Sequence, residues 1–503
     1  MLRWILGLAA LTSALSAAAA PPNIVILYAD DMGYGDLGIQ NPDSKIPTPH
    51  LDQLAREGMR FTDAHSSSGI CTPSRYALLT GRYHWRKFHD IVNSFDPPVF
   101  DAEPTLASVL KAQGYATACI GKWHLGWDWD AIKNPAAKPE KHGEDKAASY
   151  LSTDFDWSKP IPGGPLARGF DYYFGDDVPN FPPYTWIEND RVLAAPTVPY
   201  APDPRPEEGS PEGRPGPMVE GWKQDAVMPT LTKQVVDWIA AREGQEQPFF
   251  LYFPWTSPHA PIVPAKEWIG STKAGGFGDY VHQSDAHAGT VLAALEAHGF
   301  RENTLVVFTA DNGPEHYAYE RVRKFDHRSM GPLRGLKRDI WEGGHRVPFV
   351  VRWPGHIEAG SVNDALIGQI DLMATIAAIA GAELPPGAAE DSINQLPVLR
   401  GDQPFVRRAH VHNTFADGWA MRLGDWLLID KPTGDVSKVP EWYEKQMGYS
   451  KNPLPGALFN LKDDLPEQHN HFAEQPERVE ALQQLLATIR AGGAGAKSAQ
   501  AAE

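Results

Sequence analysis

The amino-acid sequence predicts an α/β protein: a large, mixed but mostly parallel sheet sandwiched by helices, with a smaller α+β domain towards the C-terminal end. Apolar runs of strand length alternate with helical patterns along most of the chain. Several of these runs lead directly into polar loops. From about residue 400 the pattern changes to short strands followed by one helix. At 503 residues the chain is also long enough for one large and one small domain.

Four continuous apolar runs, residues 23–28, 115–120, 248–253 and 305–309, are typical of buried strands. Each run leads into a loop that carries charged or metal-binding side chains, in chain order Asp30 and Asp31, then Lys122 and His124, then His259, then Asp311 and Asn312. Ligand and active sites in such sheets form outside the carboxyl ends of the strands. We therefore expect these side chains to meet at one edge of the sheet.

Helical patterns lie at residues 49–56, 231–241, 286–297 and 476–491, and short C-terminal strands at 420–430 and 457–461. The first helix has Thr48 as its expected N-cap. Residues 127–225 are rich in Pro, Gly, Trp and Asp and are expected to form long ordered insertions. The expected organisation is a main domain over 21–400, a C-terminal α+β domain over 401–490 and a disordered tail over 491–503.

Residues 1–20 have the features of a secretory signal peptide, with basic Arg3, an apolar stretch and small residues before Pro21. No other apolar run is long enough to span a membrane. The sequence has no Asn-x-Ser/Thr acceptor for N-glycosylation. We therefore expect an exported bacterial protein, periplasmic or secreted. The formal net charge of −17 argues against nucleic-acid binding, which requires a basic surface.

The chain has two cysteines, Cys71 and Cys119. Pro73 suits the first turn of a helix that Gly81 ends, so Cys71 is expected at a helix N-terminus. A thiol there would be acidified and nucleophilic. Cys119 lies in an apolar strand and is expected to be a buried core residue. A disulfide between the two is the alternative in an exported protein, and we rank it second.

The run Cys71-Thr72-Pro73-Ser74-Arg75, followed by Thr80-Gly81-Arg82, resembles the signature of the type I sulfatases, arylsulfatase-like enzymes of the alkaline phosphatase superfamily. The resemblance covers most of residues 22–470. It implies an alkaline phosphatase-like fold and hydrolysis of sulfate esters. It also implies that a maturation enzyme converts Cys71 to formylglycine, whose hydrated form attacks sulfur.

Asp30, Asp31, Asp311 and Asn312 offer hard oxygen donors, which suit Ca²⁺ or Mg²⁺ better than zinc. Taken alone, such pairs after strands are more often turn residues. The resemblance implies that these four residues bind a divalent cation, usually Ca²⁺, together with the modified Cys71.

Five cationic or imidazole side chains stand in settings that match the family: Arg75, Lys122, His124, His259 and Lys337. Individually, such a lysine is normally solvated and such a histidine normally structural. The resemblance implies that they stabilise the sulfate charge and move protons. By the same resemblance, Asp311 accepts the proton of the attacking hydroxyl, His259 or Lys337 protonates the departing alcohol, and His124 acts in the step that releases sulfate.

Substrate contacts are expected from residues beside these motifs and from the C-terminal domain: His84, Trp85, Arg86, Trp127, His316, Tyr317, Arg321, His412 and Trp419. Aromatic rings stack on sugar faces, and Arg or His can bind sulfate or carboxylate groups. Ordinary packing is an equally good interpretation of any single one. The favoured substrate is a sulfated carbohydrate, from algal polysaccharide or glycosaminoglycan.

Two other functions stay open at this point. A phosphodiesterase or phosphonate monoester hydrolase of the same superfamily would share the fold, and fold does not decide function. A non-catalytic protein that binds sulfated glycans would be expected to lack at least one of the catalytic or metal residues. All of them are present in this sequence.

Overall fold

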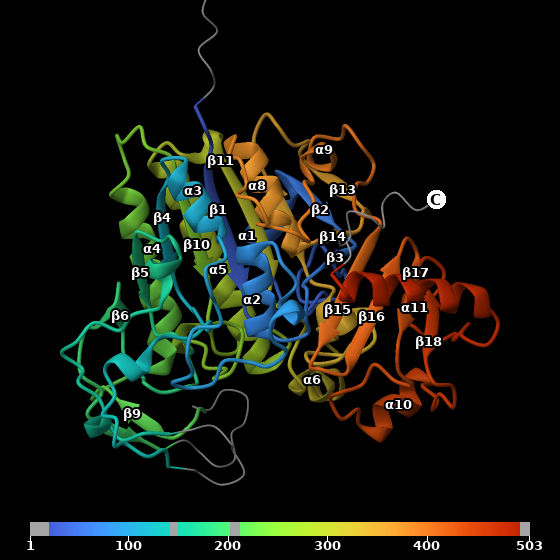
Figure 1. The fold of residues 1–503 in the computed structure, drawn as a ribbon, viewed down its shortest axis with the longest axis horizontal. Coiled ribbons are helices and arrows are strands. Elements are labelled where there is room, and N and C mark those ends of the chain that lie inside the picture. Colours follow the sequence, from blue (N-terminus) through green and yellow to red (C-terminus); the bar gives the residue numbers. More distant parts are fainter. Residues whose placement is uncertain (1–19, 141–148, 202–211, 493–503) are drawn as a thin grey trace, which may run out of the picture.

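The computed structural model describes residues 20–140, 149–201 and 212–492 (Figure 1). The predicted signal peptide, apart from Ala20, and the predicted tail beyond Gly492 lie outside the described residues. Within the described part of the chain, no helix has the length and apolar character needed to cross a membrane.

A mixed ten-stranded sheet forms the centre of the molecule, in the order β13-β2-β12-β11-β1-β10-β4-β5-β6-β7. Its strands are β1 (Asn23–Ala29), β2 (Met59–Phe61), β4 (Ala116–Ile120), β5 (Tyr172–Gly175), β6 (Ile187–Glu188), β7 (Arg191–Val192), β10 (Phe249–Pro254), β11 (Thr304–Ala310), β12 (Phe349–Arg352) and β13 (Ser361–Asn363). The middle five, from β11 to β5, are parallel. The antiparallel pairs lie towards the two edges, which confirms the predicted mixed, mostly parallel sheet.

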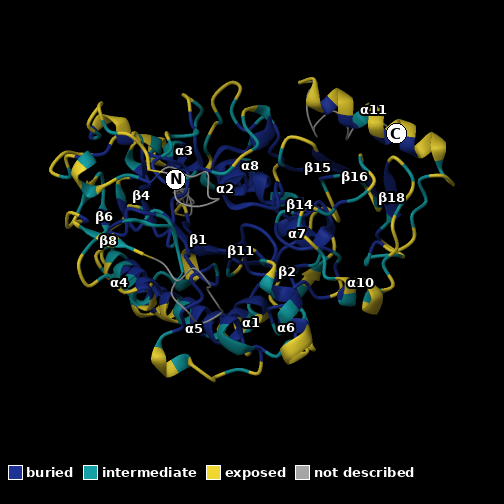
Figure 2. Ribbon diagram, turned by 90° about the horizontal axis from the view of Figure 1, so that it is seen from below, coloured by how far each residue is buried: buried dark blue, intermediate teal, exposed yellow. Residues whose placement is uncertain are grey.

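Helices cover both faces of this sheet. The α-helices of the described residues, including those outside these two layers, are α1 (Pro49–Arg56), α2 (Cys71–Thr80), α3 (Leu106–Ala112), α4 (Val227–Ala240), α5 (Gly275–Ala297), α6 (Tyr317–Phe325), α7 (Glu342–His345), α8 (Leu372–Ala380), α9 (Leu396–Leu399), α10 (Glu441–Met447) and α11 (Pro476–Arg490). Figure 2 shows α2, α3 and α8 on one side of β1 and β11, and α1, α4 and α5 on the other.

Strand β1 supplies side chains to both layers because successive residues of a strand point to opposite faces. Ile24 and Ile26 belong to the core shared with α2, α3 and α8. Val25 and Leu27 belong to the core shared with α1, α4 and α5. A strand buried on both faces favours apolar residues in succession, which is the pattern of β1 after Asn23.

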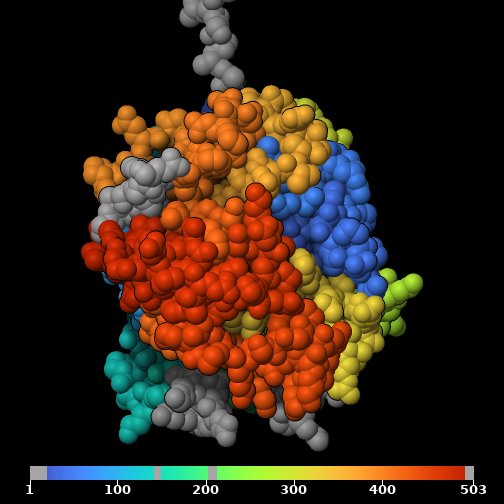
Figure 3. Space-filling view, turned by 90° about the vertical axis from the view of Figure 1, so that its right-hand side faces the viewer, coloured from blue at the N-terminus to red at the C-terminus, as the bar shows by residue number. Residues whose placement is uncertain are grey.

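A four-stranded antiparallel sheet, β15-β16-β17-β18, forms the C-terminal part. Its strands are β15 (Ala409–Thr414), β16 (Gly418–Leu423), β17 (Trp426–Ile429) and β18 (Ala457–Asn460), and α11 packs on it. Figure 3 shows this part, orange to red, as one continuous face of the molecule. Two further small sheets pair β3 (Ala64–His65) with β14 (Ile367–Gly368) and β8 (Val198–Tyr200) with β9 (Gly216–Met218).

Two details of the expected layout were wrong. Helix α5 begins at Gly275, not at residue 286, because its first half carries Asp279 and Asp285 among buried residues and so lacks a clean apolar stripe. Residues 127–225 are not only insertions: β5, β6 and β7 extend the main sheet. Thr48 is the N-cap residue of α1, as predicted, although its side chain makes no cap hydrogen bond and its hydroxyl donates to Asp52 instead.

Candidate active site

The residues predicted from the four strand ends come together beyond the carboxyl ends of β1, β4, β10 and β11. These strands are neighbours in the sheet and parallel, so the loops that follow them meet. Helix α2 brings Cys71 to the same place: its Sγ lies 3.7 Å from Asp30 Oδ1. The sequence expectation that these distant segments converge therefore agrees with the geometry.

Cys71 opens helix α2, and every residue of that helix is buried. Gly81 ends the helix with φ 64°, a left-handed conformation that suits glycine. Burial raises the pKa of the Cys71 thiol to about 12, although Lys122 and Lys337 oppose the rise. The expected acidification of the thiol was therefore wrong, since desolvation outweighs the nearby positive charge. An unmodified Cys71 would be a poor nucleophile near neutral pH.

Cys71 and Cys119 are both free, so the alternative of a disulfide is excluded. Cys119 lies in β4, fully buried, and belongs to the core on the α2 side of the sheet. The prediction of a packing role for this residue is confirmed.

Three buried carboxylates and three buried cations form the floor of the site. Lys122 Nζ lies 2.6 Å from Asp30 Oδ2. Arg75 Nη2 lies 2.8 Å from Asp311 Oδ2, and Lys337 Nζ lies 2.7 Å from Asp31 Oδ1. Formal charges therefore balance within this set, which is how carboxylates and cations are tolerated away from water.

The charges of Lys122 and Arg75 lower the pKa of Asp30 against the opposing effect of burial, the largest contribution. Burial and the charge of Asp30 raise the pKa of Asp311. Asp30 and Asp311 thus lie in the same group of charges, but the pKa of Asp30 is lowered whereas that of Asp311 is raised.

The same floor has the donors that a hard divalent cation requires. Single ligand atoms of Asp30, Asp31, Cys71 and His259 all lie within 4.8 Å of one another. The Oδ1 atom of Asn312 is buried and has no hydrogen-bond partner among the described residues, while its Nδ2 donates to Asp31 Oδ1 at 2.7 Å. An unsatisfied carbonyl oxygen beside carboxylates fits a cation bound at this point.

The hydrogen bonds of the two site histidines define which ring nitrogen is free. His124 Nε2 donates to the carbonyl of Val92 at 2.8 Å, so its Nδ1 carries a lone pair. That Nδ1 has no partner among the described residues. His259 Nδ1 donates to the Ala260 carbonyl, which leaves Nε2 towards Asp31 Oδ2 at 3.7 Å.

Burial lowers the pKa of both imidazoles. For His124 the pKa falls well below its ordinary value, with the charge of Lys122 as the next cause. For His259 burial and the charge of Lys337 lower the pKa to about 3. Both rings are therefore neutral in the free site, and His124 Nδ1 is available to accept a proton.

Sequence reasoning missed four charged residues at this site. Glu315 accepts from Arg338 Nη1 at 2.6 Å and lies 3.7 Å from Lys337 Nζ. Asp177 accepts from the backbone N–H of His124 at 3.1 Å. Asp176 is buried with neither carboxylate oxygen bonded to a described residue, and burial raises its pKa to about 7. Only the position of Asp176 and Asp177 directly after a strand could have indicated them.

Most of the residues expected to contact substrate are buried in side-chain clusters. Trp127 packs against Trp129 and Tyr173, and Arg321 lies over the Phe277 ring. Trp85 packs on Trp419, and Arg86 pairs with Asp391 while lying over Trp85. His84 contacts Asn413, and His412 stacks on His345.

His316 and Tyr317 are placed differently. His316 is exposed and Tyr317 is partly buried, their rings lie 4.2 Å apart, and His316 Nδ1 contacts Glu315, the neighbour of Lys337. Of the expected substrate residues, this pair connects the charged floor to the surface.

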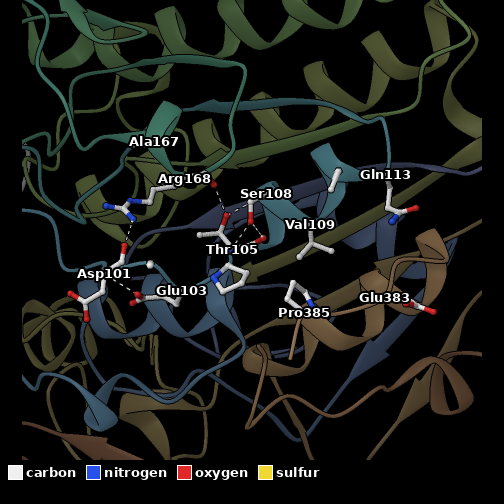
Figure 4. Close-up of a pocket in the computed structure, with 13 residues that line it drawn as sticks. Asp101, Glu103, Thr105, Ser108, Val109, Gln113, Ala167, Arg168, Glu383 and Pro385 are labelled. Atoms are coloured by element: carbon white, nitrogen blue, oxygen red, sulfur yellow. Dashed lines mark hydrogen bonds between the residues drawn. The ribbon is translucent and has the colours of Figure 1, made fainter. Parts of the chain in front are cut away.

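A separate hollow of about 520 Å³ lies away from these residues (Figure 4). Its lining includes Glu103, Thr105, Ser108 and Arg168, where Thr105 Oγ1 donates to the Arg168 carbonyl. None of the predicted catalytic or metal residues lines it. The contacts of Arg168 there are structural, in line with its place in a turn.

Comparison with known proteins places the chain in a family. A sequence model of the family described as Sulfatase matches residues 22–382. The chain is 31% identical to N-acetylgalactosamine-6-O-sulfatase of Bacteroides thetaiotaomicron, over 93% of each chain. It is 34% identical to arylsulfatase A of Bos taurus, over 96% of this chain and 90% of that one.

Solved structures agree. One from a study of glycosaminoglycan metabolism by Bacteroides thetaiotaomicron matches with a TM-score of 0.78 and 30% identity, covering 94% of this chain and 100% of that one. The phosphonate monoester hydrolase of Agrobacterium radiobacter shares the fold, with a TM-score of 0.58 and 18% identity over 94% and 96% of the two chains. The chain belongs to the sulfatase family, in the alkaline phosphatase-like superfamily. It is a sulfuric ester hydrolase.

Proposed function

We propose that this enzyme removes sulfate groups from sulfated carbohydrates, with a nucleophile made from Cys71 and a Ca²⁺ ion beside it. The observation that supports this best is the position of Cys71 Sγ, 3.7 Å from Asp30, above a floor of matched carboxylates and cations. A glycan-binding protein without activity has no need of so many buried charges around one cysteine.

We propose that the active enzyme contains two groups that are absent from the unmodified chain, a formylglycine and a divalent cation. Conversion of Cys71 to formylglycine supplies a hydrated aldehyde whose hydroxyl is a nucleophile, where the buried thiol with its pKa of about 12 is not. Asp30, Asp31, Asp311 and Asn312 would hold Ca²⁺, with Mg²⁺ as the alternative, and the bound ion would supply positive charge that stabilises the nucleophile and the sulfate. The maturation enzyme that forms formylglycine is a further proposed partner.

The remaining roles belong to side chains already positioned. Arg75 and Lys122 hold Asp311 and Asp30 in place through buried ion pairs. Lys337 and His259 both lie beside Asp31, and Lys337 donates to the sulfate oxygens. His259 has a bare Nε2 in the free site, so it donates to sulfate only after the bound anion has favoured protonation of that atom. One of the two then protonates the departing alcohol. Asp311 takes the proton of the attacking hydroxyl. His124 offers its free Nδ1 as the base for release of sulfate.

The proposal of a carbohydrate substrate rests on the names of two relatives and on the pair His316 and Tyr317 beside the charged floor. Two relatives are named for N-acetylgalactosamine 6-sulfate, one from Bacteroides thetaiotaomicron and one from Mus musculus. His316 and Tyr317 provide a ring pair beside the charged floor that suits a sugar face. We propose glycosaminoglycan fragments as the first substrates to test and algal polysaccharides as the second.

Export and domain layout are also proposals. The residues before Pro22 have signal-peptide character, and a periplasmic or secreted location suits an enzyme that acts on extracellular polysaccharide. We propose that the catalytic domain spans 21–400 and the C-terminal α+β domain 401–490.

The test is product release from defined esters by the mature protein. We expect inorganic sulfate from at least one sulfated oligosaccharide in a panel that varies sugar and sulfate position, and none from the Cys71→Ala variant. Phosphonate monoesters and phosphodiesters are assayed in parallel. If these were cleaved far faster than every sulfate ester, the phosphonate or phosphodiester alternative would replace the proposal.

A further inference from the structure

A second buried cluster of histidines lies where the C-terminal sheet meets the main domain. His65 ends β3, His345 ends α7, and His410 and His412 belong to β15. All four are at least 98% buried. None of them has a role in the proposed reaction.

The hydrogen-bond partners of His65 and His345 determine their tautomers. His65 Nε2 lies 2.7 Å from Asp63 Oδ1. Each oxygen of Asp63 is also paired with an arginine, Oδ1 with Arg346 and Oδ2 with Arg422, so this carboxylate is ionised and only accepts. His345 Nε2 lies 3.1 Å from the Ile340 carbonyl, which also only accepts. Both Nε2 atoms therefore carry the ring proton.

It follows that both Nδ1 atoms have bare lone pairs, and they face each other at 3.0 Å. Two lone pairs at that distance repel unless a cation lies between them. The cation is either a proton, which makes one ring an imidazolium, or a metal ion. A third donor without a hydrogen-bond partner among the described residues, Glu342 Oε1, belongs to the same cluster and favours the metal ion over the proton.

Glu342 supplies a third donor. One ligand atom each of His65, Glu342 and His345 lie within 4.8 Å of one another. Glu342 Oε1 is buried and has no hydrogen-bond partner among the described residues. Its Oε2 is held by Arg346 Nη1 at 3.0 Å, which fixes the carboxylate while leaving Oε1 open.

We propose that His65, His345 and Glu342 bind a divalent transition metal, of which Zn²⁺ fits best, in a site separate from the Ca²⁺ site. Two imidazoles and one carboxylate are donors that zinc accepts and calcium does not favour. Metal-binding histidines donate their other N–H to a carboxylate or a backbone carbonyl, as His65 and His345 both do.

Two arginines oppose any added positive charge in this cluster. Arg346 and Arg422 lie 3.1 and 3.0 Å from the two oxygens of Asp63. Their charge neutralises Asp63 and Glu342, so the metal must be held by strong bonds to the two nitrogens. This requirement selects zinc over calcium or magnesium. His412, stacked on His345 with ring centroids 3.5 Å apart, fixes the plane of that imidazole.

The proposed metal is structural. It would tie β3 to α7, two segments also joined by the hydrogen bond from Ser66 N to the His345 carbonyl. Ser66 begins the loop that leads to Cys71, so the metal would brace the segment that carries the nucleophile. This inference does not depend on the proposed substrate.

The test is the metal content of the full chain produced with zinc and calcium in the medium, measured by plasma mass spectrometry after dialysis. We expect one equivalent of zinc in the wild type. The His65→Gln and His345→Gln variants lose zinc and retain calcium, whereas Asp31→Asn loses calcium and retains zinc.

The matched control is His327→Gln. His327 is equally buried and paired with a carboxylate, Asp36, but its other ring nitrogen accepts from the Lys45 N–H, so no lone pair is open. Zinc content is expected to be unchanged there. If the site variants do not fold, cobalt-loaded wild type is examined for tetrahedral absorption bands. The proposal would be overturned if the wild type contained no transition metal and added zinc did not raise its thermal stability. A proton shared between His65 Nδ1 and His345 Nδ1 would then explain their contact.

Discussion

Arg75 and Asp311, 236 positions apart in the chain, form a fully buried pair in which Nε and Nη2 both donate to Oδ2, at 3.1 and 2.8 Å. Arg75 Nη1 donates further to the Lys122 carbonyl. One guanidinium thus connects helix α2 with the loops after β4 and β11, and we expect both stability and turnover to depend on it.

Replacing Arg75 by Met leaves the Asp311 carboxylate buried without its partner. We expect a loss of about 3–5 kcal/mol in the free energy of unfolding, together with loss of turnover. Urea unfolding followed by circular dichroism measures it. Lys233→Met is the control, because its pair with Asp237 is exposed and contributes about 0.5 kcal/mol or less. Equal losses in the two variants would contradict the role assigned to Arg75.

Asn312→Leu removes the unsatisfied Oδ1 at nearly constant volume. We expect the Ca²⁺ concentration for half-maximal sulfatase activity to rise about tenfold or more, equivalent to ~1.4 kcal/mol. Calcium titration of chelator-treated enzyme measures this shift, with the exposed Asn303→Leu as control. An unchanged calcium requirement would remove Asn312 from the metal site.

His124→Gln removes the free Nδ1 base. If this base acts in sulfate release, the first turnover still liberates the alcohol, and steady-state turnover falls about 10²–10⁴-fold. Rapid mixing with an aryl sulfate is expected to show a burst of one equivalent of phenol per enzyme. A variant with no burst, in which both products slow equally, would place His124 in the first step.

Asp176 makes stability depend on pH. Its pKa is raised by burial to about 7 in the folded protein, against about 3.9 when unfolded. The folded state therefore binds more protons between these values, and stability falls as the pH rises through that window.

Asp176→Asn removes this effect. We expect the variant to exceed the wild type by about 2–4 kcal/mol at about pH 8 and to match it at about pH 4. Thermal unfolding across this range measures the difference. Asp417→Asn, at an exposed site, is expected to show no such trend. A pH-independent difference at position 176 would mean that this carboxylate is paired.

The residues at the strand ends could be predicted because the sequence shows both the apolar run that forms each strand and the polar residues that follow it. Asp30 and Asp311 each follow an apolar run, and β1 and β11 pair in parallel register, Ala29 opposite Ala310. Functional residues of such sheets gather outside the carboxyl ends of the strands, so the position of each residue directly after a strand was sufficient. The buried cation positions followed from the family resemblance.

The other residues of the site could not be predicted, because their roles depend on contacts with side chains from distant parts of the chain. Arg321 was expected at the substrate but lies buried against Phe277, from a helix it meets only in the fold. Glu315 was missed because its significance comes from Lys337 and Arg338, on a later loop. A charged residue in a polar loop has the same local pattern whether it contacts solvent, substrate or another side chain.

The most direct test of the account is the mass of the peptide that contains Cys71, isolated from active enzyme produced in its own host. We expect the mass of formylglycine, an aldehyde in place of the thiol, and trapping of that aldehyde by a hydrazine reagent should abolish sulfate release. Full activity from protein in which every Cys71 is an unmodified thiol would contradict the account.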